Sequence, residues 1–519
     1  MKKNIYCPLC LKRGKKKILG RVSDDTSGTL YSSESEITRD NVQKVVTYAM
    51  QTHELNRKDI KYLIEYEKGR QDILDREKPV RPEINEKIVE NHASQIVNFK
   101  TAFVFGSPIR YVQKAEQELK SETTSDEDDG YIGELNSMCF DERKHTKDQE
   151  LAKTFLTCGV GYRGVFPQKD KTAYTPFRIV NLDPMNTFII YSPDIFHEPL
   201  LAVTYWRDMN DKGVVEETHY TAYTNDRVFQ FTDTHVGEVE ESVNGIGAIP
   251  IVEYRQDYDK MGCFERAIGL LNAINTCTSD RLNGLAQNVQ SFIWFDNVDM
   301  NKEDYDELRE NGALSTTSRN GTTASVKTIE TSLNQNEIQS LSDYLYAQLL
   351  QICAMPSREA QSGSTTGQSS MLSGGWQEAE EDAYRLEEMF DEGEKKFLAI
   401  VKNILDRSNT VVKEEVKLRD IDIKFSRNKV TNMLVKTQGL LNMKTFGIHP
   451  RVAIQTADLF SDPQQVYVDS REYLDAAYNT ELKADTNDDG KDLQSNPQGD
   501  NPATVTNDQN TQMSFVNSG

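Results

Sequence analysis

Apolar residues recur at helical spacing in two segments near the middle of the chain, residues 264–289 and 335–355. In each segment the apolar positions lie three or four residues apart, or multiples of these, which is typical of one face of an α-helix. The pattern predicts two packing helices, the second of which ends before Pro356. The two apolar stripes consist of Leu271, Ile274, Leu282, Leu285 and Val289, and of Ile338, Leu341, Leu345, Leu349 and Ile352.

A third and longer helix is predicted after Gly374 and Gly375, ending near Leu405, with apolar residues at the same spacing. At 1.5 Å per residue it is about 45 Å long. Gly393 lies inside it, where a glycine costs about 1 kcal/mol relative to alanine. Two interpretations remain open for this glycine: a tolerated position on the surface, or a bend that turns the helix.

The region from residue 159 to 258 has a different pattern, with short β-branched and aromatic runs separated by Asp, Asn, Gly and Pro. These runs predict a β-rich region. Helical patterns occupy residues 37–66, 85–97 and 131–158, so helices and strands are segregated and the fold class is predicted as α+β. Later elements are predicted as a strand at 420–425 and short helices at 430–441 and 449–459.

The order of the central segments does not suit a compact monomer. Residues 292–334, between the first two helices, are too short for a domain of their own, and a Ser/Gly-rich loop at 357–375 precedes the long helix. A helix pair that carries a small module at its far end is better suited to one subunit of a ring. We therefore expect adjoining copies to cover the apolar stripes.

Composition limits the partners of the chain. It has 519 residues, 37% of them hydrophobic and 27% charged, and a formal net charge of −22. This balance gives no general cationic surface for nucleic acid or an anionic membrane, so DNA that meets the protein is not expected to be gripped. Without an apolar run of about 18 residues or a signal-peptide pattern, we expect a soluble protein made in the cytosol, with no membrane partner. The seven cysteines are mostly scattered, which indicates reduced thiols.

Two short patterns raise the question of metal binding or catalysis. Cys7 and Cys10 form half of a zinc-ribbon ligand set, but the other half is missing, which favours a basic arm over a zinc site. His92 has no second ligand four residues on, so a packing or capping role is favoured.

Three loops have some features of ligand-binding sites but lack other groups that binding requires. The consecutive acids at 121–130 have no fixed geometry, and Asp485–Gly490 matches the first half of a calcium loop without its bidentate glutamate. Gly363–Ser369 lacks the lysine and the glycine spacing of a phosphate-binding loop. We expect no cofactor and no catalytic residue.

Three motifs occur in order within about forty residues. They read Y-x-K-G-x-x-D-I-L at 66–74, N-x-K-I-V-x-N at 85–91 and F-G-x-P-I at 105–109. In this combination the chain resembles the portal, or head-to-tail connector, proteins of long-tailed double-stranded DNA bacteriophages. Further similarity lies in the runs at 181–188 and 245–254 and in F-G-I-H-P at 446–450.

The resemblance implies a portal fold whose parts are repeated around a central channel. In chain order these parts are a basic arm and linker (1–36), wing (37–262), first stem helix (263–290), clip (291–334), second stem helix (335–356), tunnel loop (357–377), long helix and returning wing strand (378–428), crown (429–475) and disordered tail (476–519). By the same resemblance, the residues of the two apolar stripes are expected to pack in the stem. The tunnel loop places Ser362, Gly363, Ser364, Thr365, Thr366, Gly367, Gln368 and Ser369 at the DNA channel, and the clip strands carry Trp294, Phe295, Val326 and Ile329.

The same resemblance implies a function. Twelve copies are expected to form the ring at one capsid vertex of the virion, after assembly in the host cytoplasm. Double-stranded DNA is expected to pass through without sequence specificity, packaged by the terminase large subunit and later ejected. Head-completion or adaptor proteins, the capsid and scaffolding proteins are the other expected partners. The alternative is another structural ring component of the head–tail junction, such as an adaptor; an enzyme is disfavoured because no catalytic groups converge.

Overall fold

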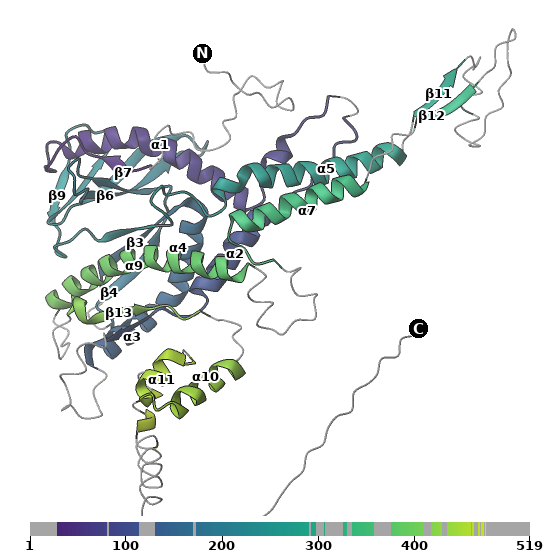
Figure 1. Cartoon of the computed structure of the whole chain (residues 1–519). Helices are drawn as coiled ribbons and strands as arrows, with labels where there is room; N and C mark the ends of the chain where they lie inside the picture. Colours follow the sequence, from purple (N-terminus) through teal and green to yellow (C-terminus); the bar gives the residue numbers. More distant parts are fainter. Residues whose placement is uncertain are drawn as a thin grey trace, which may run out of the picture. The chain divides into compact units, whose positions relative to one another are not determined.

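The computed structural model of the chain describes residues 28–79, 82–113, 130–169, 173–289, 292–296, 306, 325–329, 335–357, 375–408, 417–427, 433–457, 459–460, 466–467, 469–471 and 473. They belong to two compact units, Met1–Lys429 and Val430–Gly519, and each is described by itself. The first unit combines helices with mostly antiparallel strands, most of which lie between residues 160 and 255 (Figure 1), so the predicted α+β class is confirmed.

The β-rich region forms two packed sheets. The larger has the order β1-β5-β6-β7-β8-β9 and the smaller β10-β3-β4. All their neighbouring strands are antiparallel except β1, which pairs parallel with β5. The strands are β1 (Leu30–Tyr31), β3 (Val160–Pro167), β4 (Phe177–Leu182), β5 (Thr187–Tyr191), β6 (Pro199–Met209), β7 (Val215–Tyr223), β8 (Arg227–Thr232), β9 (Glu240–Val243) and β10 (Ile251–Arg255). The predicted runs are confirmed as β3 to β8 and β10, whereas β9 was not predicted and β1 lies in the segment predicted as linker.

Alternate residues of the larger sheet enter two different cores. Phe188 and Ile190 of β5 pack against α1 (Val42–Glu67) on one face. Ile189 between them packs with the smaller sheet on the other face, together with Ala202 of β6. Because side chains alternate along a strand, one short apolar run can serve both layers.

A third core is mostly helical. Phe105 of α2 (His92–Phe105), Phe155 of α4 (Lys144–Cys158) and Phe390 of α9 (Trp376–Arg407) contact one another at its centre. Residues of β2 (Arg110–Gln113), α3 (Gly130–Asp141), η4 (Glu265–Ala267), η6 (Leu418–Asp420) and β13 (Ile421–Lys424) also contact this core, and β13 pairs with β2. The short helix η2 (Asp72–Asp75) lies between α1 and α2 in the chain.

The two central helices lie side by side and carry a β-hairpin at their far end (Figure 1). They are α5 (Ile268–Val289) and α7 (Gln335–Ile352), and the hairpin strands are β11 (Phe292–Asp296) and β12 (Ser325–Ile329). Both predicted helices and both hairpin strands are confirmed. Helix α7 ends three residues earlier than predicted, just before Ala354, which has a left-handed φ of 50°.

Two predictions are corrected by the structure. Residues 85–91 do not continue α2 toward the N-terminus; they are extended, and α2 begins at His92. Gly393 is buried rather than on the surface, inside a helix that is assigned as one element from 376 to 407. A Cβ at Gly393 would lie 2.4 Å from the Tyr254 ring, so close packing requires the glycine.

Among its described residues, the second unit has the helices α10 (Met433–Thr445) and α11 (Pro450–Ala457), which are joined by a four-residue turn. Gly447 adopts a φ of 74° after α10, and Pro450 is the first residue of α11. Glycine after a helix and proline at a helix start match their usual positions. The predicted short helices are therefore confirmed, with ends shifted by one to four residues.

Candidate functional site at the base of the paired helices

The apolar stripes of α5 and α7 change surroundings along their length. At the base, Leu271, Ile274 and Leu349 are at most 1% exposed and belong to the helical core. Toward the hairpin, exposure rises to 39% at Leu282, 46% at Leu285 and 50% at Leu341. Ile338 and Leu345 are half-buried and Ile352 is exposed, while the side chain of Val289 lies outside the described residues.

A polar stripe on α5 replaces the apolar one where the helix meets residues 84–91, which we call the strap. Asn275, Ser279 and Asn283 are spaced by four residues and are at most 2% exposed. They hydrogen-bond to the backbone of strap residues 86, 88 and 90. The bonds run from Glu86 N to Asn283 Oδ1 (2.7 Å), from Asn283 Nδ2 to Glu86 O (3.0 Å), from Ile88 N to Ser279 Oγ (2.9 Å) and from Glu90 N to Asn275 Oδ1 (2.8 Å).

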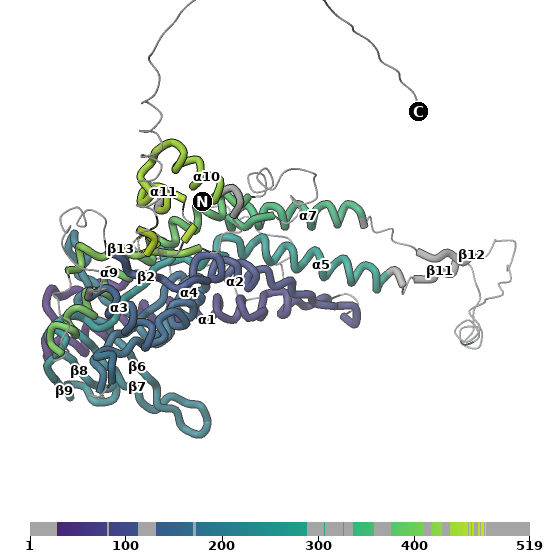
Figure 2. Tube along the Cα trace, turned by 90° about the horizontal axis from the view of Figure 1, so that it is seen from below, coloured from purple at the N-terminus to yellow at the C-terminus, as the bar shows by residue number. Residues whose placement is uncertain are grey.

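Helix and strand geometry explain why this series of four hydrogen bonds, which we call the ladder, stays in register. Four residues of helix advance about 6.0 Å, and two residues of extended chain advance about 6.6 Å. Every second strap residue therefore meets every fourth residue of α5. The backbone bonds that a helix would have made are replaced by side-chain bonds, which is why residues 85–91 are extended. In Figure 2 the purple strap region runs along α5 on the side away from α7.

The motif residues that suggested a portal protein hold the strap and its approach in place. Gly69 adopts a φ of 90° after α1. Asn91 caps α2 by accepting a bond from Ser94 N, and it also donates to Glu67 O at 2.7 Å. Asn272 of α5 donates to Asp72 at 3.1 Å, and Lys87 donates to Leu74 O at 2.6 Å. The motif is thus a folding unit that joins α1, α2 and α5.

His92 has the packing role that its sequence favoured. It is the first residue of α2, and its ring lies 4.9 Å from the ring of Tyr346 on α7. Its two nitrogens contact Gln95 Oε1 at 2.9 Å and Glu90 Oε2 at 3.1 Å. The side chain therefore connects the end of the strap to the second paired helix.

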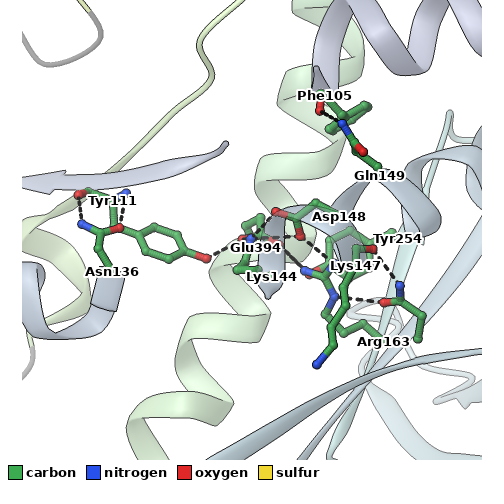
Figure 3. A network of polar contacts seen from close by, with 11 residues as sticks. Phe105, Tyr111, Asn136, Lys144, Lys147, Asp148, Gln149, Arg163, Tyr254 and Glu394 are labelled. Atoms are coloured by element: carbon green, nitrogen blue, oxygen red, sulfur yellow. Dashed lines mark hydrogen bonds and ion pairs between the residues drawn. The ribbon is translucent and has the colours of Figure 1, made fainter. Parts of the chain in front are cut away.

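A buried ionic network fixes α9 to the sheets and to α4 (Figure 3). Glu394 of α9 contacts Lys144 of α4 at 2.9 Å and Arg163 of β3 at 3.0 Å, and Arg163 also contacts Asp148 at 2.6 Å. All four side chains are at most 4% exposed. The Tyr111 and Tyr254 hydroxyls donate to Glu394 at 2.6 and 2.9 Å. With these partners the buried charges are compensated.

The network holds Glu394 in its charged form. Burial alone raises the pKa of Glu394, but the Lys144 ammonium and the Arg163 guanidinium outweigh burial and keep that pKa below its ordinary value. Burial lowers the pKa of Lys144, and the Asp148 and Glu394 carboxylates reverse the effect and raise it. Both partners therefore stay ionised around neutral pH.

Other residues predicted at functional sites lie partly or wholly outside the described residues. Phe295 pairs with Val326 in the hairpin, Trp294 with Lys327 and Phe292 with Ile329, but their side chains are outside the description. The loop residues 362–369, Cys7, Cys10 and Asp485–Gly490 are outside it as well. Their roles remain predictions.

Metal binding has no support among the residues that the structure describes. Nowhere among them do three His, Cys, Asp or Glu side chains gather as a metal ion requires. No described helix has the length and apolarity needed to cross a membrane. Cys139 and Cys158 are buried, and burial raises the pKa of the Cys139 thiol to about 12. What the geometry shows is a rigid joint between a helix pair and the body of the first unit.

Comparison with known families identifies the chain. The model of the family described as phage portal protein, SPP1 Gp6-like, matches residues 48–477. The chain belongs to this family. The resemblance seen in the sequence is therefore confirmed, and the family assigns a portal function in a phage, which in general is structural and not enzymatic. A comparison with curated proteins found no match.

The match covers most of both units, from α1 to beyond α11. The strap, the paired helices and the ionic network all lie within it. Sequence reasoning missed the polar stripe of α5 and the network. The regular spacing of Asn275, Ser279 and Asn283 was visible, but small polar residues opposite an apolar stripe usually mark the solvated face of a helix.

Proposed function

We propose that copies of this chain close into a ring around a central channel at one vertex of a phage capsid. The observation that carries the proposal is the exposure of Leu282, Leu285, Leu341 and Tyr344 on helices that bury Leu271, Ile274 and Leu349 nearer the body of the first unit. Several large apolar side chains exposed on neighbouring helices are typical of an interaction site. In a cyclic ring each copy presents different faces to its two neighbours, so these residues pack between copies.

Within this ring the family order assigns a part to each element. The two sheets and their helices form the wing, α5 and α7 the stem, the β11–β12 hairpin the clip, and α10 with α11 the crown. The loop at 357–377 becomes the tunnel loop. Family membership and the match of element order to the predicted parts support this assignment.

The channel passes double-stranded DNA without holding it. The chain has a formal net charge of −22, which disfavours tight binding of phosphate. Tight phosphate contacts would create binding minima that slow transport. The small polar side chains of Ser362–Ser369 offer contact without charge or bulk. DNA enters during packaging by the terminase motor and leaves by the same channel on ejection.

The clip is the proposed docking point for the terminase large subunit and later for head-completion or adaptor proteins. Wing and crown contact the capsid, and scaffolding proteins take part in assembly in the host cytoplasm. Twelve copies are expected. The alternative, an adaptor-like ring at the head–tail junction, is less well supported because the family that matches is that of portal proteins.

Ring formation can be tested by sedimentation of purified protein. We expect a ring-sized species for the unchanged chain and its loss in the double variant Leu282→Asp, Leu341→Asp, because a charge cannot be buried between copies without a partner. The matched control is Val243→Asp, at an 85% exposed position on β9 outside the stem. A monomer for the unchanged chain, or equal loss in the control, contradicts the proposal.

A further inference from the structure

The larger sheet has one face that the rest of the first unit covers only in part. Phe229 and Phe231 of β8 enter the core against α1, so Gln230 between them lies on the opposite face. The smaller sheet covers that opposite face at Ala202 of β6. Further along the strands it is exposed, and we call this part the open face. The open face carries Trp206, Asp208, Glu217, His219, Gln230 and Glu240.

The open face combines an aromatic pair with acidic residues. Trp206 and His219 are cross-strand partners whose ring centroids lie 3.9 Å apart with only 10° between the ring planes. Trp206 is nevertheless 58% exposed. Asp208 and Glu240 are exposed and form no ion pair within the part of the chain that the structure describes. An exposed tryptophan beside unpaired carboxylates suits a partner that offers both aromatic surface and cations.

The solvent-facing side of α1 has the complementary character. Lys44, Tyr48, Gln51 and Lys58 are exposed and follow one another at spacings of four, three and seven residues, so they lie on one side of the helix. Tyr48 is 65% exposed. Neither lysine forms an ion pair with any described residue. The carboxylate of Glu54 on the same helix is held by two arginines, so it does not neutralise them.

We propose that the exposed side of α1 in one copy docks on the open face of the neighbouring copy. The inference rests on the proposed function, which brings copies together in a ring. Helix α1 lies along one side of the larger sheet (Figure 1), and the open face is on the other side. Each copy therefore presents two different surfaces in opposite directions, as closure of a cyclic ring requires.

Charge complementarity selects a second copy as the occupant of the open face. Lys44 and Lys58 supply the cations that Asp208 and Glu240 lack within their own chain. Tyr48 adds the kind of exposed aromatic side chain that anchors protein interfaces. The contact is separate from the apolar stem contact, and it differs from that contact in being screened by salt.

The test is mass photometry of the full-length protein over a concentration series, which gives the concentration at which half of the chains are in rings. The double variant Lys44→Glu, Lys58→Glu places like charges at the contact, and so does Asp208→Lys, Glu240→Lys. Each should raise that concentration on the order of tenfold, because opposed like charges disfavour a contact. A chain with all four substitutions has the charges exchanged between the two surfaces. It should form rings at close to the concentration of the unchanged chain, which also shows that both double variants can fold.

Two matched controls separate this contact from general effects of substitution. Lys169→Glu, Lys417→Glu reverses two exposed charges elsewhere in the first unit and should leave ring formation unchanged. Trp206→Ala should raise the concentration for half assembly on the order of tenfold, as loss of an interface anchor does. Phe196→Ala removes a side chain that is 75% exposed in the loop between β5 and β6 and should have no effect.

The inference is overturned if either double variant forms rings like the unchanged chain. It is also overturned if the chain with all four substitutions forms rings no better than the double variants. These results differ from a failure of the proposed function. Absence of rings from the unchanged chain contradicts the proposed function, whereas rings in the unchanged chain and equally in both double variants contradict this inference alone.

Discussion

At the residue scale, the first unit depends on a few buried ionisable groups. Glu394, Lys144, Arg163 and Asp148 meet where α9, α4 and β3 join, away from solvent. Such a network adds little stability compared with an apolar core of the same shape, but it becomes costly when one member is removed. Its effect is to fix one arrangement of α9, α4 and β3.

We expect Glu394→Gln to destabilise the protein by about 3–5 kcal/mol, because Lys144 and Arg163 are left buried without their shared carboxylate. Denaturant unfolding followed by circular dichroism measures this. The control is Glu392→Gln on the same helix, whose side chain is 44% exposed and pairs with Arg255; it should cost less than about 1 kcal/mol. Equal losses of stability in both variants would show that the buried network contributes no more than an exposed ion pair.

His53 should make the stability of the first unit sensitive to acid. Burial lowers the pKa of His53 from 6.5 to about 4, so the unfolded chain takes up a proton over a pH range in which the folded chain does not. Stability therefore falls as pH drops from about 6.5 to 4, by about 3 kcal/mol from this residue. His53→Gln should flatten that part of the pH profile, whereas the exposed His235→Gln should leave it unchanged. An identical profile in His53→Gln refutes the assignment.

At the element scale, the strap shows which features of the fold the sequence alone could predict and which it could not. Helical and strand periodicity predicted α5, α7, α9 and the strands of both sheets, because burial of one face dominates those patterns. Residues 85–91 were predicted as helix because Ile88, Val89 and Ala93 fit a helical stripe. Local pattern could not show that α5 supplies side-chain partners for the strap backbone nearly two hundred residues away.

The ladder makes a direct prediction. Asn283→Ala leaves the Glu86 N–H and C=O without their partner, which should cost about 1–3 kcal/mol. Hydrogen exchange of a peptide covering residues 84–91 should accelerate. Gln287→Ala is the control, since Gln287 continues the four-residue spacing but is not part of the ladder. Unchanged exchange in Asn283→Ala would mean that the strap is held by other contacts.

Gly393 gives the second prediction for an element. Gly393→Ala improves helix propensity, yet its Cβ would meet the Tyr254 ring, so overpacking should win and destabilise the protein by about 1–3 kcal/mol. In α5, Gly269 has open space around it, and Gly269→Ala should stabilise by about 0.5–1 kcal/mol. Thermal unfolding of both variants is sufficient. If both substitutions stabilise the protein, the inferred close packing of Gly393 against the Tyr254 ring is wrong.

At the scale of the whole molecule, each unit leaves part of its apolar surface uncovered. In the first unit the exposed stripe lies beyond the packed base of α5 and α7, and in the second Leu441 and Phe446 are 60% and 86% exposed. The motifs revealed the family because the residues that carry it fold together around the strap. Ring closure and copy number could not be predicted from the sequence of one chain. In a single chain, a contact between copies is visible only as exposed apolar surface, which does not show how many copies meet.

The most direct measurement is a cryo-electron microscopy reconstruction of the purified full-length protein. We expect a closed ring with an axial hole, in which Leu282, Leu285, Leu341 and Tyr344 are buried against a neighbouring copy. A particle without an axial opening, or a ring in which these four side chains still face solvent, would contradict it.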